Sequence, residues 1–122
     1  IATAFEEAAI AFVGRLAQTG QLGFFPERIG GWWHREAEID LLAVNLTEKI
    51  ALVGECKWTI NPVGTNILED LKQKAQVLLK DHEIEKIQFA VFARNGFTRD
   101  LEDRSKIDGT RLFTVGSLVN SG

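Results

Sequence analysis

A chain of 122 residues has the length of one domain, because domains most often contain about 100–150 residues. Apolar residues make up 45% of the chain, charged residues make up 25%, and there are only two prolines, which excludes a disordered or collagen-like protein. A formal net charge of −3 does not indicate a strongly basic nucleic-acid clamp, and the uninterrupted apolar stretches are far shorter than the roughly 18 residues of a membrane span.

The expected cellular setting follows from the single cysteine and from the first residues. Cys56 has no second cysteine to pair with, so no internal disulfide can form. The first residues lack the basic and then apolar pattern of a secretory signal. We therefore expect a reducing, cytoplasmic environment. The chain begins at Ile1 and contains no methionine, and we expect residues 1–122 to form a single domain of a longer protein.

The first half of the chain is expected to form a helix followed by a β-hairpin. From Ala2 to Ala17, apolar residues recur at the spacing of one helical face, and Gly20 and Gly23 end the pattern. Residues 30–35, which include two adjacent tryptophans, lead into the hairpin. Its two strand-like runs, separated by a short polar turn, are Ala37–Leu46 and Ile50–Trp58.

The second half alternates helices and strands. A helix is expected after Asn61-Pro62, with Asn66 as its N-cap and an apolar stripe at Ile67, Leu71, Ala75 and Leu78. A strand, a short helix and a last strand then follow, at Ile87–Ala93, Thr98–Lys106 and Arg111–Val115. This order, α-β-β-β-α-β-α-β, predicts an α/β fold with a mixed central sheet flanked by helices.

Charged residues occur on both hairpin strands among residues that are typical of a core. Side chains alternate along a strand, so one face of the first strand is expected to carry Glu38, Asp40, Leu42, Val44 and Leu46. The same spacing puts on one face of the second strand Ala51, Val53, Glu55 and Lys57. Neither face is typical of a simply solvated surface.

The register of the hairpin decides whether the acids meet. If Asn45 pairs with Ile50, Asp40 stands directly opposite Glu55, at a Cβ separation of about 4.5–5.5 Å where like charges destabilise a hairpin. A divalent cation would compensate, since Mg²⁺ is commonly held by one or two carboxylates together with water and substrate phosphates. Lys57 adds a positive charge beside them. The alternative is a structural salt-bridge cluster at a sheet edge.

Each of the two longer helices offers one further candidate. In the first helix, where each residue advances by about 100°, Glu6 lies at the margin of the apolar face and Glu7 lies on the polar side. Only Glu6 is therefore expected to reach toward the sheet. In the second helix, Lys74 lies close to Ile67 and is expected either to reach the acids or a phosphate, or to extend its amine into solvent from the edge of the core.

Asp40, Glu55-Cys56-Lys57 and an acid in a preceding helix together resemble the PD-(D/E)XK, or restriction-endonuclease-like, nuclease superfamily. The similarity extends to an uncharacterised nuclease-like domain at the C-terminus of certain archaeal and bacterial AAA+ type ATPases. The segments that carry this similarity span nearly the whole chain: Phe5-Glu6, Gly31-Trp32-Trp33, Glu38-Ile39-Asp40, Gly54-Glu55-Cys56-Lys57-Trp58, Leu71-Lys72-Gln73-Lys74-Ala75 and Gly96-Phe97.

The resemblance implies a restriction-endonuclease-like αβββαβ core and a divalent-metal-dependent nuclease that hydrolyses phosphodiester bonds in DNA. It implies Asp40 and Glu55 as ligands of Mg²⁺ or Mn²⁺, Lys57 beside the scissile phosphate and Glu6 as an auxiliary acid. Such a metal would polarise the phosphoryl oxygen and lower the pKa of the attacking water. An N-terminal ATPase domain outside this chain is implied as well. The alternative is a catalytically silent module of the same fold that docks on DNA or regulates the attached ATPase.

Several other residues are expected to have mainly structural roles. His34 is more typical of a structural imidazole, with assistance to a metal-bound water as the alternative. Trp32 and Trp33 are neighbours on an extended segment and face opposite ways, so one is expected in the core, and the alternative for the other is stacking on a base. Cys56 points away from Glu55 and is expected to be a small buried hydrophobe.

Basic residues in the last third of the chain alternate with acids. Arg94, Arg99, Arg104 and Lys106 are interleaved with Asp100, Glu102 and Asp103, a pattern that favours a solvated helix over a nucleic-acid path. A third functional alternative is a protein-interaction domain that forms a homodimer through an edge strand near Trp58.

Overall fold

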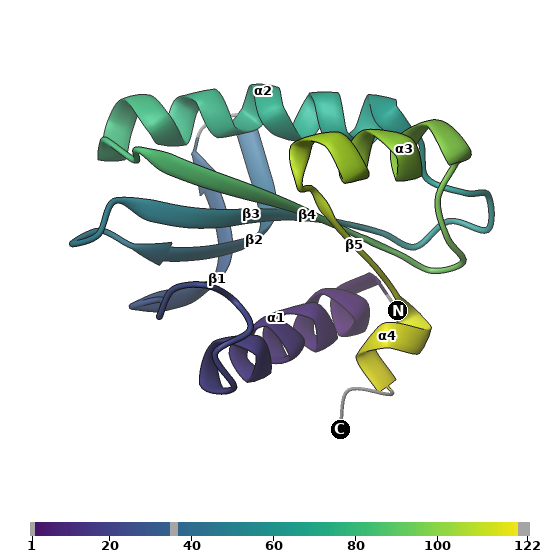
Figure 1. Cartoon of the computed structure of the whole chain (residues 1–122), viewed down its shortest axis with the longest axis horizontal. Coiled ribbons are helices and arrows are strands. Elements are labelled where there is room, and N and C mark those ends of the chain that lie inside the picture. Colours follow the sequence, from purple (N-terminus) through teal and green to yellow (C-terminus); the bar gives the residue numbers. More distant parts are fainter. Residues whose placement is uncertain (1, 35–36, 120–122) are drawn as a thin grey trace.

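The computed structural model describes residues 2–34 and 37–119, which form a sheet between two layers of helices (Figure 1). In chain order, the elements are α1 (Ala2–Gln18), β1 (Arg28–His34), β2 (Ala37–Asn45), β3 (Ile50–Lys57), α2 (Thr65–His82), β4 (Lys86–Ala93), α3 (Arg99–Asp108), β5 (Arg111–Thr114) and α4 (Val115–Val119). The expected α/β class and αβββαβ order are confirmed. None of the helices in the described residues has the length and apolar character needed to cross a membrane.

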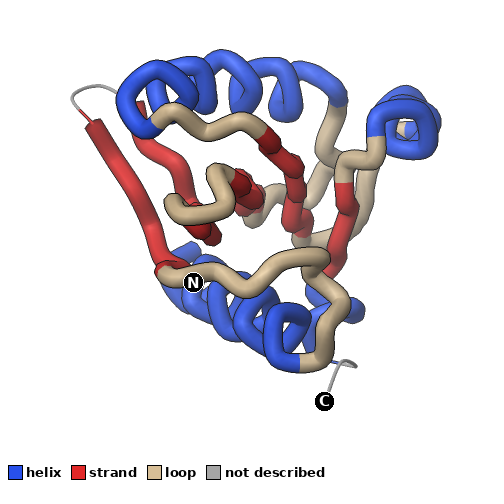
Figure 2. Tube along the Cα trace, turned by 60° about the vertical axis from the view of Figure 1, so that its left-hand side comes forward, coloured by secondary structure: helices blue, strands red, loops and turns tan. Residues whose placement is uncertain are grey.

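The five strands form one mixed sheet in the order β1-β2-β3-β4-β5. The pairs β1–β2 and β2–β3 are antiparallel, whereas β3–β4 and β4–β5 are parallel. Helices α2 and α3 cover one face of the sheet, and α1 and α4 cover the other (Figures 1 and 2). The strand that leads to Trp58 is therefore the centre of the sheet. The expectation of an edge strand near Trp58 is wrong, because β4 pairs with β3 along its whole length.

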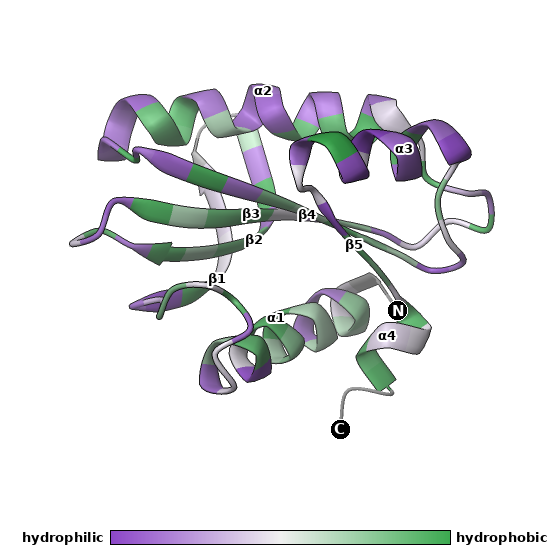
Figure 3. Cartoon of the chain, in the orientation of Figure 1, coloured by the Kyte–Doolittle hydropathy of each residue, from purple (hydrophilic) through white to green (hydrophobic). Residues whose placement is uncertain are grey.

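Apolar stripes on the two long helices hold these layers together. The buried stripe of α1 packs on the sheet side of Leu41, Leu52 and Phe92, and it consists of Phe5, Ala9, Phe12, Val13 and Leu16. The buried stripe of α2 consists of Leu68, Leu71, Ala75 and Leu78. Figure 3 shows α1 coloured mainly hydrophobic and α3 mainly hydrophilic, which fits a deeply packed helix and a solvated one. The periodicity of the sequence thus locates both faces of the core.

Helix α2 begins one position before the expected N-cap residue. Its N-cap is Gly64, whose backbone is extended and whose position has no side-chain cap, and Asn66 lies inside the first turn. The reason is tertiary, because Val63 is fixed immediately before the helix: its N–H donates to Gly96 and its carbonyl accepts from Thr98. The expected N-cap at Asn66 is therefore wrong. In α3, Thr98 is the N-cap, and its side chain accepts a hydrogen bond from the Leu101 N–H.

A β-bulge interrupts β2 at Asp40 and Leu41. The register of β1 against β2 shifts between Gly30 and Trp32, and over this interval β2 contains one residue more than β1. In consequence Leu41 packs in the core beneath α1, whereas Ile39 packs on the side of α2. Residues two apart would share a face in a regular strand. The expected unbroken alternation from Glu38 to Leu46 is therefore wrong at Asp40.

The tryptophans of β1 divide as the alternation predicts. Trp32 is partly buried against the α2 side of the core, whereas the side chain of Trp33 is 74% exposed. Cys56 is half-buried in the core beneath α1, as expected for a small hydrophobe on the face opposite Glu55.

Phe92 is the largest fully buried side chain, and it packs against the rings of Phe12 and Phe113 at centroid distances of 6.5 and 5.3 Å. We expect Phe92→Ala to lower the free energy of unfolding by about 3–5 kcal/mol, because it removes the packing and leaves a cavity. Ile107→Ala is the control, since Ile107 is 85% exposed, and its effect should stay within about 0.5 kcal/mol. Urea denaturation followed by circular dichroism measures both, and equal effects of the two substitutions would contradict this description of the core.

Candidate functional site

The acids of the hairpin meet where the ladder between β2 and β3 ends. The two strands pair from Asn45 with Ile50 to Leu41 with Gly54, which is the register assumed from the sequence. Asp40 and Glu55 are the next residues along the two strands. Instead of continuing the backbone ladder, the Asp40 carboxylate accepts a hydrogen bond from the Cys56 N–H, at 2.9 Å from Oδ2. The bulge therefore brings the carboxylate of Asp40 to the backbone of β3, immediately beside Glu55.

Glu55 is a buried acid whose carboxylate has too few hydrogen-bond and ion-pair partners. The residue is 6% exposed, in a strand that otherwise contributes to the core. Its Oε2 lies 3.6 Å from Nζ of Lys57 and 3.6 Å from Nζ of Lys74. Both distances exceed the usual 2.7–3.2 Å range of N–H···O hydrogen bonds. Its Oε1 is buried and has no hydrogen-bond partner among the described residues.

The surroundings of Glu55 shift the pKa of its carboxyl group in favour of the neutral form. Burial raises the pKa of Glu55 above its usual value, and the negative charge of Asp40 raises the pKa further. The positive charges of Lys74 and Lys57 act in the opposite direction without cancelling the increase. Burial and the charge of Asp40 therefore outweigh the two lysines in setting the pKa of Glu55.

Helix α1 adds a third carboxyl group to this electrostatic cluster. Glu6 is half-buried and Glu7 is exposed. Burial raises the pKa of Glu6, and the charges of Asp40 and then Glu38 add to the increase. Glu6 is thus the acid of α1 that interacts with the hairpin. Burial is the main cause that raises the pKa of the Cys56 thiol, and the charges of Asp40, Glu6 and Glu55 add to the increase. The raised pKa disfavours the reactive thiolate form.

The structure thus brings together the four main candidates named from the sequence and one auxiliary candidate, from four different elements. The main candidates are Glu6 in α1, Asp40 in β2, and Glu55 and Lys57 in β3, and the auxiliary candidate is Lys74 in α2. His34 ends β1, where its backbone pairs with Ala37, but its side chain lies outside the described residues. Its expected auxiliary role therefore stays a prediction.

One cation near the site was placed elsewhere by the sequence reasoning. Arg94 follows β4 and its N–H donates to the Lys57 carbonyl, so it lies at the end of the central strands and not on α3. Its guanidinium stacks on the ring of Trp58, 4.9 Å from the ring centroid, and that ring in turn packs against Phe5. The parallel pairing of Lys57 with Ala93 creates this position. The sequence therefore indicates that Arg94 lies near Lys57 only when the pairing of β3 with β4 is known.

The donors available for a metal ion are hard carboxylate oxygens. In the part of the chain that the structure describes, no group of three or more His, Cys, Asp or Glu side chains is arranged to hold an ion. Asp40 and Glu55 form a pair of adjacent carboxylates, one of which has an unpartnered oxygen. Such a pair is the protein contribution that Mg²⁺ commonly receives at phosphate-processing sites.

Comparisons with known proteins place the chain in a family. DUF234, a family of archaeal and bacterial proteins of unknown function, matches residues 1–87. An uncharacterized protein of Methanocaldococcus jannaschii, MJECL04, is 39% identical over 82 residues, which are 65% of this chain and 19% of that protein. The chain therefore spans about a fifth of the length of this relative.

A solved structure shares the fold. The crystal structure of AF1548, a protein of unknown function, matches with a TM-score of 0.59 over 95% of this chain and 66% of that chain. The two sequences are 19% identical, and at that level the match shows the common fold alone.

The raised pKa of Glu55 gives the stability of the fold a definite pH dependence. Between the ordinary glutamate value of 4.5 and the higher pKa of the folded state, the folded protein binds more protons at this site than the unfolded chain. The stability contributed by Glu55 is therefore fully present below the unfolded pKa and is lost as pH rises through the folded pKa. Relative to the wild-type protein, we expect Glu55→Gln to become more stable as the pH rises from about 4 to about 7.5.

Urea denaturation of both proteins across this pH range measures the difference. Glu7→Gln is the control, because it removes one exposed carboxylate and leaves Glu55 in place. A stability difference between wild type and Glu55→Gln that stays constant over the range would contradict the raised pKa.

Proposed function

This chain belongs to the DUF234 family of archaeal and bacterial proteins of unknown function. We propose that it is a divalent-metal-dependent nuclease domain that hydrolyses phosphodiester bonds in DNA. The proposal assigns Asp40 and Glu55 as metal ligands, Lys57 as the cation beside the scissile phosphate and Glu6 as an auxiliary acid. The similarity of the sequence to PD-(D/E)XK nucleases supports it. The proposal rests on one observation: the buried carboxylate of Glu55 has one oxygen without a partner and one oxygen 3.6 Å from two ammonium groups.

A buried carboxylate normally has partners for both of its oxygens, because leaving a charged group buried and unpaired costs far more than an ordinary hydrogen bond contributes. Glu55 has one oxygen without a partner and one oxygen 3.6 Å from two ammonium groups. A salt-bridge cluster built for stability would bring the lysines into hydrogen-bonding distance. The arrangement is better explained as a site whose remaining positive charge is supplied by a bound cation.

The residues present fit Mg²⁺ or Mn²⁺. Both are hard cations that take oxygen ligands, and Asp40 and Glu55 supply such ligands from adjacent strands. When bound, the metal supplies Lewis-acid activation of a phosphoryl oxygen and a water of lowered pKa. Its positive charge also reverses the local electrostatics, because carboxylates alone repel a phosphate.

The lysines are positioned for the phosphate that such a site would receive. The side chains of Lys57 and Lys74 are 36% and 32% exposed, so their amines reach solvent while remaining close to Glu55. An ammonium group held there stabilises negative charge that develops on the phosphoryl oxygens and costs little reorganisation during the reaction. Glu6, whose pKa burial and the charges of Asp40 and Glu38 raise, is the further carboxyl group available for proton transfer.

Nucleic acid is the substrate class that the surrounding charges favour. Lys57 lies beside the acids, and Arg94 lies at the end of the neighbouring strand on the exposed surface. Lys74 completes a group of three cations near this end of the central strands, on a chain whose net charge is −3. A polyanion with regularly spaced phosphates can contact this group and the metal site at once.

The second candidate function is a catalytically silent module that docks on DNA or regulates an attached ATPase domain. One observation favours it: in the described residues no group of three acids or other ligands is arranged around an ion. A silent module would bind neither Mg²⁺ nor Mn²⁺ and would leave DNA intact. A homodimer and a cytoplasmic location stay predictions under either function.

We expect Asp40→Asn and Lys57→Met each to reduce Mn²⁺-dependent cleavage of DNA by roughly 100-fold or more, because each removes charge from the position of the reacting phosphate. Lys86→Met is the matched control, since Lys86 is an exposed strand lysine at the distant end of β4, and it should cleave like the wild type. Gel assays on single-stranded and duplex DNA measure the rates, with circular dichroism to show that each variant folds. Equal rates in all four proteins would refute the proposal.

Asp40→Asn and Lys57→Met should both impair cleavage but should differ in their effect on metal binding. In Asp40→Asn, Mn²⁺ binding measured by calorimetry should weaken at least about ten-fold, because an anionic ligand is lost. In Lys57→Met, binding should be retained or strengthened, because a repelling cation beside the site is removed. Loss of binding in Lys57→Met with retention in Asp40→Asn would contradict the assigned roles, and absence of any binding by the wild type would favour the silent module.

A further inference from the structure

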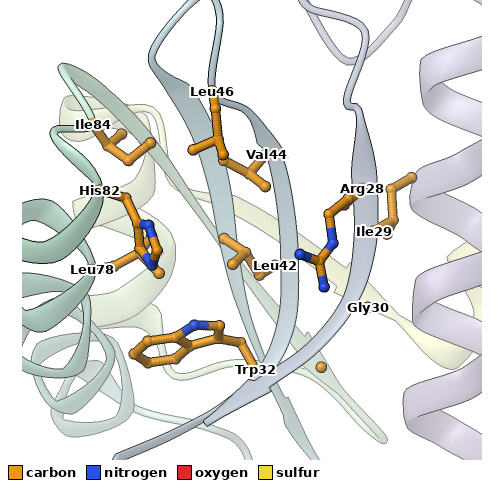
Figure 4. Close-up of a pocket in the computed structure, with 11 residues that line it drawn as sticks. Arg28, Ile29, Gly30, Trp32, Leu42, Val44, Leu46, Leu78, His82 and Ile84 are labelled. Atoms are coloured by element: carbon orange, nitrogen blue, oxygen red, sulfur yellow. The ribbon is translucent and has the colours of Figure 1, made fainter. Parts of the chain in front are cut away.

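A second candidate site is a cavity between β1, β2 and the carboxyl end of α2 (Figure 4). Its volume is about 140 Å³, and it shares none of its lining residues with the acidic cluster. Most of its wall is apolar and comes from Trp32, Leu42, Val44, Leu46, Leu78 and Ile84. In Figure 4 the indole of Trp32 closes one end of the space, and the aliphatic side chains of β2 line its back. The cavity is thus a partly open and mainly apolar pocket near the edge of the sheet.

The cavity is open because a strand residue lacks a side chain. Gly30 lies in β1 between Arg28 and Trp32, which both line the cavity, so a side chain at position 30 would also point into it. A Cβ atom at Gly30 would meet nothing within 4 Å, and Gly30 does not have the positive φ that would require glycine. Glycine inside a strand weakens the strand and often marks the close approach of a ligand. Neither local backbone conformation nor packing explains the glycine here.

Two polar side chains at the rim have no hydrogen-bond or ion-pair partner among the residues that the structure describes. Arg28 and His82 lie on opposite sides of the cavity, and Figure 4 shows their side chains turned toward the space between β1 and α2. Within the described residues, neither makes a hydrogen bond or an ion pair. The nearest acid along the chain is Glu27, but its carboxylate accepts hydrogen bonds from the Leu46 N–H and the Thr47 hydroxyl. The guanidinium of Arg28 is therefore available to an external anion.

We propose that this cavity binds a small amphipathic carboxylate, with an aromatic or branched aliphatic body. The body lies against Trp32 and the aliphatic wall of β2, and the carboxylate pairs with the guanidinium of Arg28, which matches a carboxylate in shape as well as in charge. Ligand pockets commonly combine an apolar lining with a few polar groups that fix orientation. A free inorganic anion would leave the apolar wall unused, and a neutral hydrocarbon would leave Arg28 unpaired.

The first experiment titrates the ¹⁵N-labelled 122-residue chain with 3-phenylpropanoate. We expect saturable shifts of the amide signals of β1 and the carboxyl end of α2, together with the indole N–H signal of Trp32. The neutral 3-phenylpropanamide has the same body without the charge and should bind at least about ten-fold more weakly. Acetate has the charge without the body and should cause no saturable shift. Equal affinity for the acid and the amide would overturn the assigned role of Arg28.

Two variants test the site itself. Gly30→Leu should fill the cavity and abolish the shifts, whereas Gly14→Leu, a glycine of α1 with equally free space, should bind like the wild type. Arg28→Gln should remove the preference for the acid over the amide, and because Arg28 is exposed this variant tests the proposal even if Gly30→Leu does not fold. Unchanged binding in both Gly30→Leu and Arg28→Gln would overturn the proposal. So would shifts of the cavity signals that follow protein concentration without the acid, which would assign the cavity to a second copy of this chain.

Discussion

A glutamate carboxylate shielded from water at the end of a central strand is the constraint on which the rest of the site depends. Glu55 belongs to the same buried stretch of β3 as Leu52 and Val53, so its backbone position is fixed by the core. Among the described residues, the positive groups paired with its charge are two ammonium groups at 3.6 Å. A hydrophobic residue would fill this position at lower cost. An acid at this buried position is consistent with the proposed chemistry, which needs a fixed anion.

The bulge in β2 is the structural feature that pairs Glu55 with a second acid. A regular strand would continue the ladder past Leu41 and occupy the Cys56 N–H with backbone hydrogen bonding. The extra residue ends the ladder and lets the Asp40 carboxylate accept that hydrogen bond instead. Bulges often occur next to active sites because they redirect a side chain without disturbing the sheet. Here the bulge and the buried acid together create two adjacent carboxylates.

The sequence was sufficient for the features that depend on local periodicity. The order of elements up to β5 and the apolar stripes of α1 and α2 follow from repeats of about 3.6 or 2 residues. The hairpin register with Asn45 opposite Ile50 was one of the registers that the loop allows, and it is the one observed. The sequence was not sufficient where distant segments determine the local structure. The bulge at Asp40 depends on the pairing of β2 with β1. The start of α2 depends on the hydrogen bonds that Val63 makes with Gly96 and Thr98. Neither partner can be identified from spacing.

The candidate site shows the same division. Glu6 could be distinguished from Glu7 by its angle on a helix, and Lys74 by its place beside the apolar stripe. The sequence alone groups Arg94 with the solvated C-terminal region. Its position beside Lys57 becomes evident only from the parallel pairing of β3 and β4. The cavity at Gly30 also needs three elements to form. A glycine in a strand signals free space only when the opposing helix has been placed.

The most direct test of the central claim is a ¹³C NMR titration of the Glu55 carboxyl group with and without Mg²⁺. If the incomplete compensation of Glu55 reflects a cation site, the pKa should lie above the usual glutamate value without the metal and should fall below it when Mg²⁺ is bound. The metal then supplies the positive charge that Lys57 and Lys74 supply only in part. A Glu55 titration that Mg²⁺ and Mn²⁺ both leave unchanged would contradict the account.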